Sequence, residues 1–121
     1  MKDRQGGGNK LVKDAQAYME AHSAEKFSLR EMAGALFVNG SYLLRTFRHH
    51  TGMTPLHYHH LIRCEKAEEL LVLTEQSVSD IGETVGFVPS SHFSHVFWSV
   101  TGCTPSEYRR LHRDDAQEAE E

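Results

Sequence analysis

Apolar side chains recur every three or four residues along much of this chain, which is the spacing of amphipathic helices. One such helix starts at Ser28, which forms a capping-box signature with Glu31 three residues later. Residues 37–40 interrupt the pattern and predict a turn. A second helix capped by Asn39 or Ser41 follows the turn. The pattern therefore predicts a helix, a tight turn and a helix.

This order of elements occurs twice. Ser28 aligns with Ser77 at an offset of 49 residues. The second turn, residues 86–89, is one residue longer, and Ser90 or Ser91 starts the helix after it. Beyond this turn the offset between the two copies is therefore 50 residues. The identical pairs beyond the turn are Ser41/Ser91, Phe47/Phe97, Thr51/Thr101, Gly52/Gly102, Thr54/Thr104, Pro55/Pro105, Tyr58/Tyr108 and Leu61/Leu111. Such agreement indicates two copies of one supersecondary unit.

A longer helix is expected to connect the two copies, from about residue 55 to residue 73. Nineteen residues give a rod of about 28 Å. Its expected apolar positions are Leu56, Leu61, Ile62, Ala67, Leu70 and Leu71. With one helix before the first unit, at about residues 10–21, and one after the second unit, the fold class is all-α. We expect seven helices that form two helix-turn-helix subdomains joined by a long linker helix.

The expected boundaries follow from this order. Residues 1–8 contain three glycines and are expected to be a linker or a remnant of the expressed fragment. The remaining segments are 9–53, the first helix-turn-helix subdomain; 54–74, the linker helix; 75–113, the second subdomain; and 114–121, an acidic tail that is a frayed helix end or disordered.

The composition is that of a soluble globular protein, with no apolar run near the roughly 20 residues that span a bilayer. The N-terminus lacks the apolar core of a signal peptide, and Cys64 and Cys103 are isolated, so we expect reduced thiols and a cytoplasmic location. The net charge of −4 is unevenly distributed, because five acids lie in the last eight residues. Residues 1–113 carry 12 acids against 13 Lys and Arg, so overall charge does not exclude a nucleic-acid partner.

Two helix-turn-helix units suggest a mechanism for DNA binding. The second helix of such a unit fits the major groove, where its side chains reach base edges. Two units can read successive grooves about 34 Å apart on one side of the duplex. Because the two copies differ in sequence, the expected site is not a palindrome.

The second unit reads IGETVGFVPSSHFSHVFWSVTGCTPSEYR and closely resembles the signature of AraC/XylS-type transcription regulators. In order along the chain, the residues of that signature are I, A, VGF, S, YF, R, FK, G, TP and YR. Two other parts of the chain match the same family: the first unit, and the stretch Arg63…Ala67…Leu70-Leu71. The resemblance covers roughly residues 9–112. It implies a bacterial activator domain that binds double-stranded promoter DNA and contacts RNA polymerase. It also implies an effector or receiver domain in the full-length protein.

Carried over by position, the resemblance assigns the DNA contacts. The expected base-reading residues are Gly40, Ser41, Leu44, Arg45, Ser90, Ser91, Ser94 and His95. The expected phosphate contacts are Asn39, Arg48, Trp98, Arg109 and Arg110. Arg45 can donate two hydrogen bonds to guanine, although a surface ion pair is the alternative. The second unit departs from the family, with His95 where Arg is common and Trp98 where Lys is common. Trp98 could instead pack on a partner, and the Arg109–Arg110 pair could cap the last helix.

Other chemistry has little support in the sequence. Histidines cluster at positions 49–50 and 57–60, but the zinc spacing of known motifs is missing, so we expect solvated histidines, no metal and no cofactor. A further alternative is that some of these histidines flank the DNA backbone. No nucleophile–base–acid set or apolar carboxylate pair indicates an enzyme. The alternative function is a helical protein-interaction module with histidine-mediated metal binding and no specific DNA readout.

Overall fold

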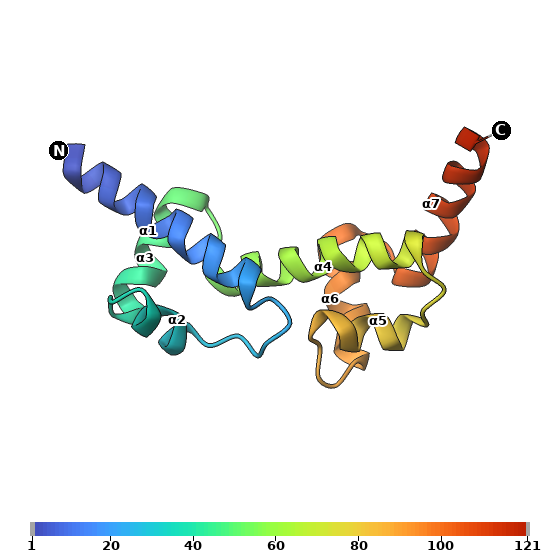
Figure 1. Ribbon diagram of the computed structural model, residues 1–121, viewed down its shortest axis with the longest axis horizontal. Helices are drawn as coiled ribbons and strands as arrows, with labels where there is room; N and C mark the ends of the chain where they lie inside the picture. Colours follow the sequence, from blue (N-terminus) through green and yellow to red (C-terminus); the bar gives the residue numbers. More distant parts are fainter. Residues whose placement is uncertain (1, 121) are drawn as a thin grey trace. The chain divides into compact units, whose positions relative to one another are not determined.

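The computed structural model describes residues 2–120, with side chains over residues 8–113. Within this range the chain forms helices and no strands, which confirms the all-α prediction (Figure 1). The seven helices are α1 (Lys2–Ala21), α2 (Leu29–Ala35), α3 (Gly40–Thr51), α4 (Pro55–Leu73), α5 (Val78–Val85), α6 (Ser91–Thr101) and α7 (Pro105–Glu120). None of the described helices is both long enough and apolar enough to cross a bilayer.

The chain divides into two compact units, and the boundary falls within α4, between Ile62 and Arg63. The first half of α4 thus belongs to one unit and the second half to the other. Residues 54–74 were expected to form a linker helix with apolar positions toward both units, and its two halves contribute buried residues to two different cores.

The core of the first unit is formed by α1, α2, α3 and the first half of α4. Helices α1 and α2 both pack against α3, so α3 is held on two sides. The buried apolar residues are Leu11, Val12, Ala15, Met19, Met32, Ala33, Leu43, Phe47 and Ile62. This packing fixes the rotation of α3 and thereby decides which of its side chains face solvent.

The core of the second unit is formed by the second half of α4 with α5, α6 and α7. Its buried residues are Cys64, Ala67, Leu71, Ile81, Val85, Phe87, Phe93, Val96 and Phe97. Arg63 is 6% exposed, and its guanidinium lies 4.9 Å from the centre of the Phe87 ring, a cation–π geometry. Burial lowers the pKa of Arg63. At Gly82 an added Cβ would lie 2.8 Å from Cβ of Phe93, so glycine permits the close approach of α5 and α6.

The predicted helix caps form. The Glu31 amide donates to Ser28 Oγ at 3.1 Å, and the Asp80 amide donates to Ser77 Oγ at 3.0 Å. Thr104 and Glu107 form a complete capping box at the start of α7, in which hydrogen bonds from Thr104 lower the pKa of the carboxyl. These local contacts set the ends of the helices on which the candidate site is built.

The turns of the two units also differ in the residue that follows the first helix. Gly86 ends α5 with a φ of 115°, and the repeat places Phe37 at the matching position with a φ of 62°. Glycine adopts this left-handed conformation without a steric penalty, whereas phenylalanine does so with strain. Phe37 is also 94% exposed, so no core contact compensates that strain.

Two expectations were wrong. Helix α1 starts at Lys2 and continues through the three glycines that were expected to form a linker. Gly8 has a packing role there, since an added Cβ would lie 2.7 Å from Nε2 of His50. Leu56, expected to be inward, is 45% exposed. It lies six residues before buried Ile62, and six residues turn a helix by about 240°, away from the core. The acidic tail from residue 114 lies beyond the described side chains.

Candidate nucleic-acid interface

The outward face of α3 carries the predicted base-reading residues of the first unit. Leu43 and Phe47 are fully buried and anchor the opposite face. A step of two residues turns a helix by about 200°, so Ser41 and Arg45 point away from these anchors and are exposed. Arg48 is exposed on the same face, while Leu44 is half-buried at its edge. The sequence-based assignment of this face is therefore compatible with the fold.

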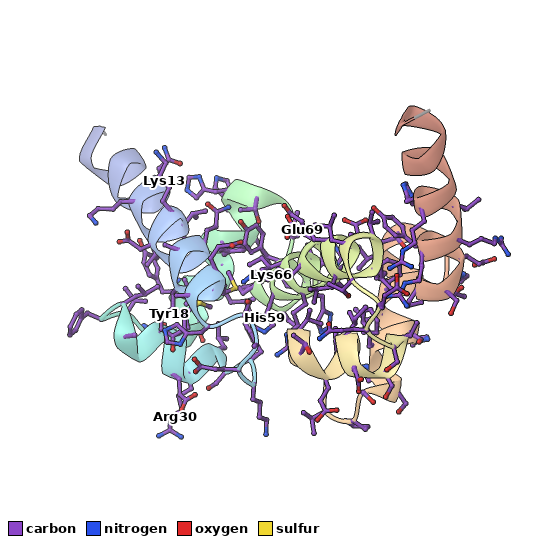
Figure 2. All side chains as sticks on the ribbon, turned by 45° about the vertical axis from the view of Figure 1, so that its right-hand side comes forward. Lys13, Tyr18, Arg30, His59, Lys66 and Glu69 are labelled. Atoms are coloured by element: carbon purple, nitrogen blue, oxygen red, sulfur yellow. The ribbon has the colours of Figure 1, made fainter. Side chains whose placement is uncertain are left out.

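An open groove of about 660 Å³ separates α3 from α2. Three predicted base-reading residues line it: Gly40, Ser41 and Leu44. The opposite wall includes Arg30, whose side chain projects from α2 away from the rest of the first unit (Figure 2). The N-terminus of α3 opens onto this groove, and its partial positive charge adds to that of Arg30.

Asn39 also lines this groove, but one of its polar atoms is already committed. Its Oδ1 accepts a hydrogen bond of 2.8 Å from the Tyr42 amide and so caps α3. The side-chain NH₂ group remains the donor with which Asn39 can reach a phosphate. The predicted phosphate contact is thus restricted to that group.

A second open groove, of about 470 Å³, lies on the other side of α3. Arg45, the fourth predicted base-reading residue, lines it. The other lining residues are Gly8, Tyr42, Thr46, His49 and His50. The outward face of α3 is therefore a ridge with a groove on each side.

Helix α6 presents the corresponding face of the second unit. Phe93 and Phe97 are fully buried, and Val96 packs beside them. Pointing away from these anchors are four exposed side chains, Ser91, Ser94, His95 and Trp98. Trp98 is 56% exposed. This face carries hydroxyls, an imidazole and an indole, but no permanent cation.

Ser90 is less available than its neighbours on α6. It is half-buried, and its Oγ lies 3.1 Å from Oγ of Ser79, which ties the start of α6 to α5. Ser90 directly precedes the first residue of α6 and has helical backbone angles. Its side chain makes no hydrogen bond that caps the helix. Its hydroxyl can reach a base only if it exchanges this contact.

Arg109, a predicted phosphate contact, is engaged within the protein. Its guanidinium donates hydrogen bonds to three carbonyl oxygens where α4 ends, those of Leu71 at 2.9 Å, Thr74 at 3.2 Å and Gln76 at 2.6 Å. The side chain therefore caps α4, not the last helix, which was the alternative considered. The Leu71 carbonyl lies in the last turn of α4, where the negative end of the helix dipole attracts a cation. Arg110, the next residue, is exposed.

The histidines do not form a metal centre within the described part of the chain. No group of three or more His, Cys, Asp or Glu side chains there is arranged to hold an ion. His49 and His50 lie on α3 with ring centres 5.2 Å apart, whereas His59 on α4 is buried with its ring 5.4 Å from that of Phe27. The metal-binding alternative has no support.

Five polar side chains that line the two grooves were not among the assigned DNA contacts: Arg30, Tyr42, Thr46, His49 and His50. The signal for three of them was present, because Tyr42, Arg45, Thr46 and His49 follow helical spacing and share one face. The role of His50 depends on the position of α1, which local sequence does not reveal.

Comparison with known proteins gives the family. A family described as a helix-turn-helix domain matches residues 32–111. The transcriptional activator RhaS of Enterobacter sp. (strain 638) is 37% identical over 94 residues, which cover 78% of this chain and 34% of that protein. The chain thus spans about a third of the length of the curated relatives it matches.

Two solved structures share the fold. A regulator with an AraC-type DNA-binding domain from Chromobacterium violaceum is 30% identical with a TM-score of 0.79, over 87% of this chain and 94% of that one. The DNA-binding domain of AdpA, solved in complex with a target DNA, is 25% identical with a TM-score of 0.79, over 86% and 94%. Family and structures are those of DNA-binding domains and not of enzymes. The chain belongs to the AraC/XylS-type family of helix-turn-helix transcription regulators, as its sequence signature predicted.

Proposed function

We propose that α3 and α6 are the two reading helices and that each enters a major groove of promoter DNA. The observation that carries this proposal is the rotation of α3: buried Leu43 and Phe47 lock one face, and the exposed polar face lies between two open grooves. A helix inserted in a major groove needs such a ridge, because a strand of the duplex runs along each side of it.

The contacts divide into two classes. Arg45 is the principal base contact in the first unit, because its guanidinium can donate two hydrogen bonds to guanine. Gly40, Ser41 and Leu44 let the duplex approach closely and add polar and apolar contacts. In the second unit Ser91, Ser94 and His95 read bases, with Ser90 in a supporting position. The phosphate contacts are Asn39, Arg48, Trp98 and Arg110.

The second unit contributes less binding energy than the first. Its reading face lacks a permanent cation, so it releases fewer counterions from DNA than a face with arginine or lysine. Because the two faces differ, the proposed site consists of two unlike half-sites in successive grooves, about 34 Å apart. Subdomains at residues 9–53 and 75–113 are the proposed reading units.

The partners proposed for the full-length protein go beyond this domain. They are RNA polymerase and an effector or receiver domain that controls DNA binding, with a location in the cytoplasm. The name of the RhaS relative says that it is a transcriptional activator, and we propose the same direction of control for the protein that contains this chain.

Selection of bound sites from a random DNA pool tests the proposal. We expect a motif with two unlike halves separated by about one helical turn. With the selected duplex, Arg45→Ala should relax specificity at a single base position at a cost of about 1–3 kcal/mol. Equal weakening on all sequences would make Arg45 a phosphate contact, and no enriched motif would refute specific readout.

A further inference from the structure

The groove on the α1 side of α3 has a lining suited to an anion. It contains one guanidinium, two imidazoles and two hydroxyls, from Arg45, His49, His50, Tyr42 and Thr46. No carboxylate is among its described lining residues. An apolar ligand would leave these donors without acceptors, whereas a phosphate oxygen can accept from each of them.

The wall of this groove lies next to α1. The His50 ring abuts the backbone of α1 at Gly8, where an added Cβ would lie only 2.7 Å from Nε2. The His49 ring meets the His50 ring at an interplanar angle of 87°. His49 shares one face of α3 with Tyr42, Arg45 and Thr46, while His50 closes the groove toward α1.

The position of the groove indicates its occupant. Arg45 borders both the reading ridge and this groove, so the groove is continuous with the surface assigned above to base contacts. The major groove of B-DNA is about 12 Å wide and is bordered by one sugar–phosphate strand on each side of an inserted helix. One strand should therefore run along the side of α3 that carries Tyr42 and His49, with His50 farther back toward α1.

We propose that this groove holds the sugar–phosphate backbone of one DNA strand, with His49 and His50 as its phosphate-binding wall and Tyr42 and Thr46 as hydroxyl donors. This inference rests on the proposed function and adds a positioning site to it. Contacts to phosphate fix the register of the helix without reading sequence. The histidines should thus contribute to affinity equally on every duplex.

The test compares two duplexes of equal length, the selected site and an unrelated sequence, by fluorescence anisotropy at fixed salt. The double variant His49→Ala/His50→Ala should bind both about tenfold more weakly and leave their affinity ratio unchanged. His49→Arg should bind both at least as tightly as the unaltered chain, because it keeps a donor and adds a permanent charge. A purely structural role would not predict this gain.

His22→Ala is the matched control. His22 follows the last residue of α1, about 20 Å along the helix from Gly8, and lines neither groove. This control should keep both affinities. Far-UV circular dichroism verifies the fold of each variant, and if the double variant does not fold, the single variant His49→Ala, at an exposed position, replaces it.

The outcomes separate this inference from the proposed function. Unchanged affinity in the double variant overturns the phosphate site while the proposed function stands. A loss confined to the selected duplex also overturns it, because the histidines would then read bases. If the unaltered chain binds neither duplex, both the proposed function and this inference are refuted.

Discussion

Substitution of Arg109 by alanine should destabilise the second unit without removing a DNA contact. The side chain donates to the carbonyl oxygens of Leu71, Thr74 and Gln76, which lie 33 to 38 residues earlier in the chain. It therefore ties α7 to the end of α4 and to the segment that leads into α5. Arg113 adds a hydrogen bond to the same Thr74 carbonyl and an ion pair of 3.0 Å with Glu75.

The magnitude follows from the exposure of these bonds. The bonds to Leu71 and Thr74 are partly buried and are worth about 1 kcal/mol each, whereas the bond to Gln76 is exposed and is replaced by water at little cost. The favourable interaction with the α4 dipole adds about 0.5 kcal/mol. We expect the free energy of unfolding of this unit to fall by about 2–3 kcal/mol in total. For a unit of about 60 residues that corresponds to a Tm lower by roughly 20 °C.

Urea titration with two probes measures the effect. The single tryptophan, Trp98, lies in the second unit and reports its unfolding by fluorescence, while circular dichroism reports the helices of both units. Arg110→Ala is the matched control, because it removes the same charge from the adjacent, exposed position on α7. Arg109→Lys should be intermediate, since it keeps the charge but loses the forked geometry.

Two results would refute this reasoning. If the free energy of unfolding of Arg109→Ala lies within 0.5 kcal/mol of that of the unaltered chain, roughly the spread of surface substitutions, the hydrogen bonds do not stabilise the unit. If Arg110→Ala costs as much as Arg109→Ala, the positive charge of α7 matters and the carbonyl contacts do not.

Three further predictions follow. Phe37→Gly should raise the free energy of unfolding by about 0.5–1 kcal/mol in a urea titration, because glycine accepts the φ of 62° without strain; a loss of stability would contradict this. Burial raises the pKa of the Cys64 thiol to about 12, so at pH 8 a thiol reagent should modify the native chain once, at half-buried Cys103, and the unfolded chain twice. The folded chain also holds the Cys64 proton more tightly than the unfolded chain, so stability should fall as the pH rises above about 9. His95→Arg should strengthen binding to the selected duplex about tenfold and steepen its salt dependence by about one counterion, and an unchanged salt slope would show that position 95 does not approach DNA.

The sequence predicted the features that depend on neighbouring residues. The bounds of α4 and the caps at Ser28, Ser77 and Thr104 follow from side chains within three residues of one another. The exposed face of α3 follows because the spacing of Leu43 and Phe47 already defines the buried one. Both kinds of information are local.

The expectations that failed depend on contacts between distant segments. Arg109 bonds to carbonyls more than thirty residues away, and no pattern around Arg109 shows that α4 ends beside it. The glycines around Gly8 suggested a linker, but in the structure Gly8 lies in α1, where the ring of His50 approaches it closely. The two grooves likewise become visible only once α1 and α2 are placed against α3.

The division of α4 between Ile62 and Arg63 limits how this chain can be cut into separate units. A duplicated unit usually begins and ends in surface loops and can be exchanged as one segment. Here the border falls in the middle of a continuous helix whose two halves fill different cores. A fragment cut at that point would carry a truncated helix with exposed apolar side chains, so either unit should be transplanted together with the whole of α4.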